Sequence, residues 1–198
     1  MKKALEEIKK LVAKSKTAII TTIILIVGGT VGILLLEYNN PHTLGPLSFG
    51  GKVLASYFQA VTPRTAGFNT VDFGKIFAPT ALLTMFLMFI GASPGGTGGG
   101  IKTTTFALIL ATVRATLRGF RDTIMFNRRI PAQTVRRAFT IAFLSITLVS
   151  LATFALDKTE NFSLLQISFE VFSAFGTVGL STGITPYLSS IGKIIIMS

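Results

Sequence analysis

The sequence predicts an all-α integral membrane protein in which the order outer span, short re-entrant helix and inner span (M1–P–M2) occurs twice. Three observations indicate this fold. Of the 198 residues, 49% are apolar and 14% are charged, whereas an ordinary soluble domain is about 25% charged. Uncharged stretches reach the ~20 residues that cross the ~30 Å core of a bilayer. The basic residues gather in two clusters, each beside such a stretch.

The basic clusters indicate how the chain lies across the membrane. The net charge is +11, and six lysines and seven arginines, 13 of the 19 basic residues, lie within 1–16 and 114–137. By the positive-inside rule we expect both clusters in the cytoplasm, and residues 38–75 and 157–187 outside. A nucleic-acid-binding protein needs a basic face on a soluble fold, so no nucleic acid partner is expected. The absence of Cys excludes disulfides and thiolate metal sites. The clusters are Lys2, Lys3, Lys9, Lys10, Lys14, Lys16 and Arg114, Arg118, Arg121, Arg128, Arg129, Arg136, Arg137.

The first part of the chain contains one span and one short helix. We expect residues 1–16 to form a cytoplasmic amphipathic segment. Residues 17–36 are uncharged and are followed by bulky side chains, not by a signal-peptide cleavage site, so they are expected to cross the membrane outward. Residues 53–63 are too few to span and fit a re-entrant half-helix, which Pro63 and Gly67 end.

The next apolar stretch, from residue 76 to 113, is too long for one span. A straight helix of this length would measure about 57 Å, nearly twice the bilayer core. The glycine-rich residues 91–100 resolve the conflict, and we expect helix 76–90, an irregular loop and helix 102–117. Non-helical backbone at membrane depth is tolerated only where protein shields it or where it lines water. The loop is therefore expected beside an aqueous path.

The second part of the chain repeats this order. Residues 138–156 form an uncharged span, 163–175 a second short helix, and 187–198 the start of a last helix. Twelve residues cover ~18 Å, so we expect the sequence to be a fragment of a longer protein. The expected organisation is an amphipathic segment 1–16, a repeat 17–117 with a broken inner helix, a basic connector 118–137, and a repeat 138–198 truncated in its inner helix.

An internal repeat aligns the two short helices and the loops after them. At an offset of 112 residues, Thr65-Ala66-Gly67-Phe68-Asn69-Thr70 matches Thr177-Val178-Gly179-Leu180-Ser181-Thr182, and the shared pattern is T-x-G-x-x-T. The carbonyl end of each half-helix carries about half a negative charge. Backbone carbonyls beyond that end can replace the hydration shell of K⁺, and Gly permits the φ values and close approach that this requires. Two such units cannot close a ring around an ion, but four can.

These strings resemble the Trk/Ktr/HKT superfamily of potassium transporters, and in particular a bacterial Ktr-type (TrkH-like) membrane subunit. Residues 62–72 resemble the third pore loop, 95–103 the broken inner helix of the third repeat, and 169–181 the fourth pore loop. The resemblance covers nearly the whole chain. It implies four M1–P–M2 repeats around one pseudo-symmetric pore, with repeats one and two missing here.

The resemblance also implies a function. It implies K⁺ uptake across the bacterial plasma membrane, without enzymatic activity or a covalent cofactor, by a homodimer in the lipid bilayer that binds a cytosolic ring of nucleotide-binding regulatory subunits. Na⁺ as a coupling ion stays open. The implied filter, whose carbonyls hold K⁺, is Thr65, Ala66, Gly67, Phe68, Thr177, Val178, Gly179 and Leu180. The implied gate is Gly91, Ala92, Ser93, Pro94, Gly95, Gly96, Thr97, Gly98, Gly99, Gly100 and Lys102, and the filter support is Asn69, Ser168 and Glu170.

Several residues keep two interpretations. Glu170, a carboxylate at membrane depth, is expected to accept main-chain hydrogen bonds behind the filter; the alternative is an exposed vestibule position. Lys102 either places a positive charge near the path or snorkels at a helix start. Asp72 either concentrates cations at the mouth or is a turn residue. Ser56 and Ser168 either brace the half-helices or repeat by ancestry.

Two alternatives to an uptake transporter also stay open: a channel-like subunit of a K⁺-pumping ATPase, and a non-conducting membrane scaffold. Residues 95–103 do not form a phosphate-binding loop, because Ile101 separates Gly100 from Lys102 and the flanks are membrane helices. By resemblance, Gly67 and Gly179 both favour K⁺, while the first loop, which distinguishes K⁺ from Na⁺ in the family, is absent.

Overall fold

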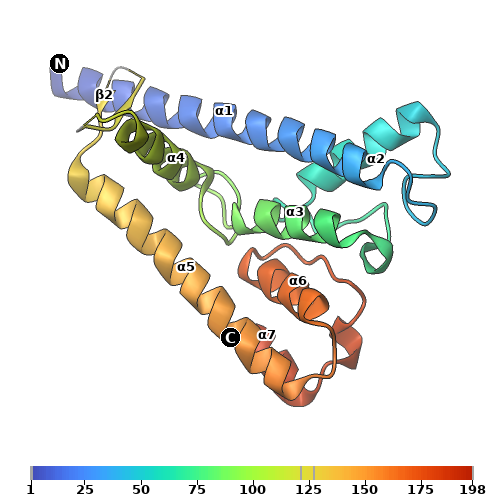
Figure 1. Ribbon diagram of the computed structural model, residues 1–198. Helices are drawn as coiled ribbons and strands as arrows, with labels where there is room; N and C mark the ends of the chain where they lie inside the picture. The colour runs from blue at the N-terminus through green and yellow to red at the C-terminus, as the bar shows by residue number, and fades with distance from the viewer. Residues whose placement is uncertain (1, 121, 127, 198) are drawn as a thin grey trace.

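The outer helix of the first repeat is one unbroken element. The computed structural model describes the backbone of residues 2–120, 122–126 and 128–197, and the side chains of these residues from position 12 on (Figure 1). Helix α1 runs over Lys2–Glu37, so the expected amphipathic segment and the expected span are continuous. Lys14 and Lys16 are exposed. The side chains of Lys2, Lys3, Lys9 and Lys10 lie outside the described residues.

Two helices are long and apolar enough to cross a membrane, Val12–Glu37 within α1 and Ala132–Thr159, which is α5. They contain the predicted spans 17–36 and 138–156. Only 22% and 11% of their apolar windows are buried within the chain, and Leu35 and Phe154 are 73% and 72% exposed. Because a helix that is apolar on all sides needs apolar surroundings, this exposure fits the predicted membrane fold.

The first short helix begins earlier than predicted. Helix α2 covers Phe49–Val61 and is N-capped by Ser48, whereas the expected helix began after Lys52. The helix tolerates this lysine because Nζ donates to the carbonyl oxygen of Tyr38 at 2.7 Å and lies 3.9 Å from the centroid of the Tyr38 ring. The cation is therefore satisfied within the fold.

The inner helix of the first repeat is broken, as predicted. After the 3₁₀ turn η1 (Phe73–Lys75), helices α3 (Ala78–Phe89) and α4 (Thr103–Leu117) flank the glycine-rich loop. A proline in the first turn of α3 suits that position, where its missing N–H leaves no bond unmade.

The second repeat contains α5, α6 (Leu164–Phe175), the 3₁₀ turn η2 (Thr185–Tyr187) and α7 (Ser190–Met197). A capping box between Ser163 and Gln166 fixes the start of α6. The last helix begins three residues later than predicted, because η2 takes up the residues before it.

The connector between the repeats contains a small hairpin that was not predicted. Strands β1 (Ile124–Met125) and β2 (Arg128–Arg129) pair antiparallel, and Asp122 Oδ1 lies 2.6 Å from Arg129 Nη2. Arg121 lies outside the described residues. Two-residue strands give too little alternation to be detected in a sequence.

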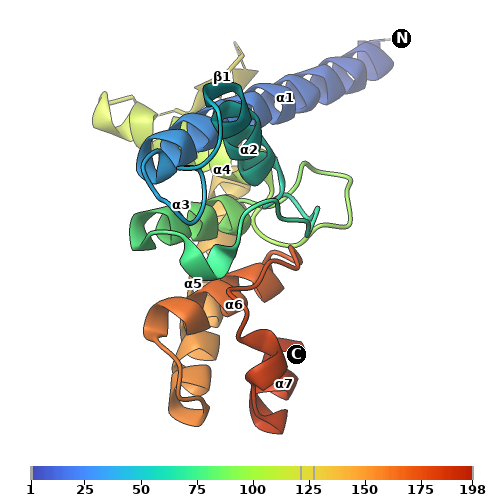
Figure 2. The same ribbon diagram turned by 90° about the vertical axis from the view of Figure 1, so that its right-hand side faces the viewer.

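The repeats pack together through α3 and α6 (Figure 2). Their shared apolar cluster contains Met85 and Met88 from α3, and Phe73 with Phe169, whose ring centroids are 5.4 Å apart. Val178 of the second glycine loop is buried in the same cluster. The interface between the repeats therefore lies beside the loops that carry the shared pattern.

Candidate functional site

The two loops with the shared pattern have the same backbone shape. We call residues 62–70 loop A and residues 174–182 loop B. Both place Thr and Gly at positive φ: 66° at Thr65 and 72° at Gly67 in loop A, and 53° at Thr177 and 85° at Gly179 in loop B. A side-chain-bearing residue pays roughly 1–2 kcal/mol for the left-handed region. Strain that occurs twice at equivalent positions indicates a functional backbone shape.

The structure brings the two loops into contact. A Cβ built on Gly67 would lie 2.8 Å from the carbonyl oxygen of Val178, and a Cβ built on Gly179 would lie 3.6 Å from the Cα of Gly67. The predicted filter residues of the two loops are therefore neighbours, although 112 positions separate them. Val178 and Leu180 are buried, whereas Phe68 is exposed.

The pattern threonines are held alike. Thr65 Oγ1 donates to the carbonyl oxygen of Arg64 at 2.6 Å, and Thr177 Oγ1 donates to that of Gly176 at 2.7 Å. Arg64 and Gly176 occupy the same place in the repeat. The guanidinium nitrogens of Arg64 are buried without an acceptor among the described residues, a costly arrangement for a cation.

Glu170 braces loop B from α6. Its buried carboxylate accepts from the main-chain N–H of Thr182 at 2.9 Å and from the hydroxyls of Ser181 and Thr185, both at 2.7 Å. The expected main-chain hydrogen bond is therefore present, and hydroxyl groups satisfy the remaining acceptor capacity. These bonds tie the end of the loop to the half-helix in front of it.

Gln59 braces loop A in the same way and was missed in the sequence. With the amide oriented by its hydrogen bonds, its oxygen accepts from the main-chain N–H groups of Thr70 at 2.9 Å and Val71 at 3.2 Å. Thr70 and Thr182 are the last threonines of T-x-G-x-x-T. A signal existed, because a polar residue in an apolar half-helix stands one position from the equivalent of Glu170.

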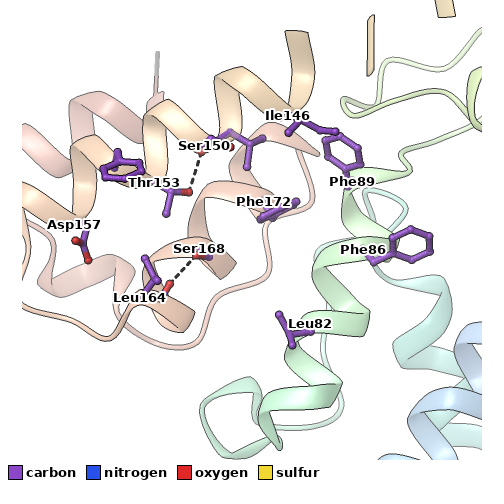
Figure 3. Close-up of a pocket in the computed structure, with 12 residues that line it drawn as sticks. Leu82, Phe86, Phe89, Ile146, Ser150, Thr153, Asp157, Leu164, Ser168 and Phe172 are labelled. Carbon is purple, nitrogen blue, oxygen red and sulfur yellow. Dashed lines mark hydrogen bonds between the residues drawn. The ribbon is translucent and has the colours of Figure 1, made fainter. Parts of the chain in front are cut away.

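The other two predicted supports do not cross to a neighbouring element. Asn69 Nδ2 donates to the carbonyl oxygen of Val71 at 3.0 Å, which ties loop A only to itself. Ser168 Oγ donates to the carbonyl oxygen of Leu164 at 2.7 Å, and the residue lines an apolar groove of about 620 Å³ between α3, α5 and α6 (Figure 3). Two positions along a helix turn a side chain by about 200°, so Ser168 and Glu170 point to different faces of α6.

The glycine-rich loop lies against both pattern threonines. The main-chain N–H of Gly99 donates to Thr177 Oγ1 at 2.7 Å, and a Cβ built on Gly98 would lie 2.8 Å from Thr65 Cγ2. The main-chain N–H of Gly100 donates to the carbonyl oxygen of Phe175 at 3.2 Å. Residues 91–100 thus cross the ends of both loops, and side chains at 98 or 99 would not fit there.

Lys102 closes the glycine-rich loop on itself. Its Nζ donates to the carbonyl oxygens of Gly98 at 2.5 Å and Gly96 at 3.2 Å. The ammonium group therefore lies on the loop and does not extend away from it, as a snorkelling lysine would. Residues 93–97 form the exposed part of this loop.

Comparison with known proteins agrees with this arrangement. The family model described as TrkH, cation transport protein, matches residues 5–198. The chain is 52% identical over 165 residues to Ktr system potassium uptake protein B of Bacillus subtilis, covering 83% of this chain and 37% of that protein. It is 42% identical over 183 residues to the protein of the same name from Vibrio alginolyticus, covering 92% of this chain and 40% of that protein.

A further relative is named for two ions. The potassium/sodium uptake protein NtpJ of Enterococcus hirae is 40% identical over 195 residues, covering 96% of this chain and 43% of that protein. The chain thus spans about two fifths of the length of these curated relatives.

Proposed function

We propose, because this chain belongs to the TrkH family of cation transport proteins, that loops A and B form two of the four pore loops of a potassium uptake transporter. The proposal rests on one observation: the two T-x-G segments share an unusual φ pattern and meet at Gly67 and Gly179. Carbonyl oxygens from such loops can replace the hydration shell of K⁺. The filter would be the carbonyls of 65–68 and 177–180, completed by two further loops of the whole protein.

The same proposal gives the glycine-rich loop a role. Its hydrogen bond to Thr177 and its contact with Thr65 set residues 91–100 across the path that an ion leaving the filter would take. We assign these residues and Lys102 to an intramembrane gate. The gate opens when the bond from Gly99 to Thr177 breaks, because that bond joins the loop to the filter.

The surroundings follow from the family and from the relatives' names. The transporter would lie in the bacterial plasma membrane as a multi-pass homodimer. Its cytosolic face, with the basic residues 118–137, would bind a ring of nucleotide-binding regulatory subunits, in line with relatives named for a Ktr system. K⁺ uptake with and without Na⁺ tests the coupling that the potassium/sodium relative suggests.

Replacing the filter glycines in the full-length transporter tests the function. Gly67→Ser and Gly179→Ser place a side chain at positive φ, and at Gly67 also against the carbonyl oxygen of Val178. We expect the ratio of K⁺ to Na⁺ uptake to fall about tenfold, in line with the cost of the left-handed region. The measurement is initial ion uptake into vesicles that contain the purified protein.

Gly28→Ser is the matched control, because a Cβ at Gly28 has nothing within 4 Å, and its uptake ratio should equal the wild-type ratio. Unchanged ratios in both filter variants would contradict the pore and favour a scaffold. Uptake that requires an ATP-hydrolysing partner would favour the pump subunit.

A further inference from the structure

Each outer helix ends in a buried glutamate. Glu37 is the last residue of α1 and is 1% exposed, and Glu160 directly follows α5 and is 9% exposed. The C-terminal end of a helix carries a partial negative charge, so a carboxylate there is unfavourable unless other groups hold it. Both glutamates therefore need strong partners, and both have them.

Glu37 reaches the start of the inner helix of its repeat. Its Oε1 accepts from the main-chain N–H of Phe77, the N-cap of α3, at 2.8 Å. Its Oε2 accepts from Asn40 Nδ2 and Thr43 Oγ1, both at 2.6 Å. Asn40 Nδ2 also donates to the carbonyl oxygen of Lys75 at 3.0 Å. The carboxylate thus fastens the end of α1 to the start of α3 (Figure 1).

Glu160 makes the equivalent connection in the second repeat. It accepts from the main-chain N–H of Ser189 at 3.1 Å and from Ser189 Oγ at 2.5 Å, directly before α7. Gly192 in α7 is buried, and a Cβ built there would collide with Glu160 Oε1. The glycine therefore leaves the space that the carboxylate occupies.

The two connections are equivalent by position as well as by chemistry. Phe77 and Ser189 are 112 residues apart, the same offset that relates loops A and B. The bonds close segments of 40 and 29 residues, and the difference of 11 lies before the loops. This insertion hides the pairing of Glu37 with Glu160 from a comparison at fixed offset.

We propose that Glu37 and Glu160 are positioning residues for ion selection: each closes the base of the segment that carries one half-helix and one filter loop. The inference rests on the proposed function of the loops. Neither carboxylate touches loop A or loop B in its printed contacts, so both act through the ends of the helices. Opening either closure frees the loop behind it and loosens the spacing of its carbonyls.

The test uses the full-length transporter with Glu37→Ala and Glu160→Ala. Losing a buried charged acceptor should lower the ratio of K⁺ to Na⁺ uptake about tenfold, and Glu→Gln should fall between, since it keeps one acceptor oxygen. Hydrogen exchange at residues 62–70 should quicken in the Glu37 variants, and exchange at 174–182 in the Glu160 variants. Gly192→Ala should act like Glu160→Ala although the carboxylate remains, and it serves if Glu160→Ala does not fold.

Asp157→Asn is the control, because this residue is exposed on the same helix as Glu160 and has no bond in the described part of the chain. It should change neither readout. Normal selectivity and normal loop exchange in folded variants would overturn the positioning role. Wild-type vesicles without K⁺ uptake would instead overturn the proposed function, and the exchange data would still decide whether the closures hold the loops.

Discussion

Loops A and B have the same backbone shape but are held by different side chains. Loop A has the neutral Gln59 behind it and the buried Arg64 within it, whereas loop B has the carboxylate of Glu170 behind it and Gly176 in the place of Arg64. The φ signs at Thr and Gly are nevertheless the same. What the repeat preserves is the course of the carbonyls, and the residues that hold them vary.

The glycine-rich loop also treats the two loops differently. It makes a hydrogen bond to Thr177 of loop B, but its contact with Thr65 of loop A is through a methyl group. Loop B is therefore both the more strongly braced loop and the one to which the proposed gate is bonded.

The largest expected difference concerns the braces. Glu170→Ala leaves four donor groups of loop B without their acceptor and should destabilise the full-length protein by about 3 kcal/mol. Gln59→Ala removes neutral bonds only and should cost about 1–2 kcal/mol. Thermal unfolding in detergent measures both, with Asp157→Asn as the control that should match wild type. Equal losses at Gln59 and Glu170 would contradict the difference in bracing.

A smaller difference is expected for the gate. Thr177→Val removes the acceptor for Gly99 N–H and should raise leak flux about tenfold, as one unpaired buried donor costs 1–2 kcal/mol, roughly. Thr65→Val keeps the methyl contact and should leave the leak within about twofold of wild type. Both variants lose the same bond to the preceding carbonyl, so their difference isolates the Gly99 bond. A leak that is unchanged in Thr177→Val would count against the gate.

The sequence predicted the features that depend on local composition. Runs of uncharged residues set the two spans, and glycine at 91–100 set the break between α3 and α4. The offset of 112 aligned the loops that the structure brings together. Glu170 was detectable because a charge inside an apolar half-helix needs partners.

The features that were missed depend on contacts between distant residues. Helix α2 begins before Lys52 because Tyr38 accepts its hydrogen bond. Gln59 is uncharged and drew no attention, and an insertion of 11 residues separates the positions of Glu37 and Glu160 in the repeat. Composition cannot report such partners, because each is chosen by the folded arrangement of several helices.

The central claim is that carbonyls of loops A and B hold a dehydrated alkali ion. It is tested most directly by anomalous diffraction from the full-length transporter crystallised in Rb⁺, which replaces K⁺ at carbonyl sites. We expect an anomalous peak between residues 65–68 and 177–180, beside Gly67 and Gly179, that Gly67→Ser weakens. Peaks only elsewhere in the protein, or glycines 67 and 179 apart and facing lipid, would contradict the account.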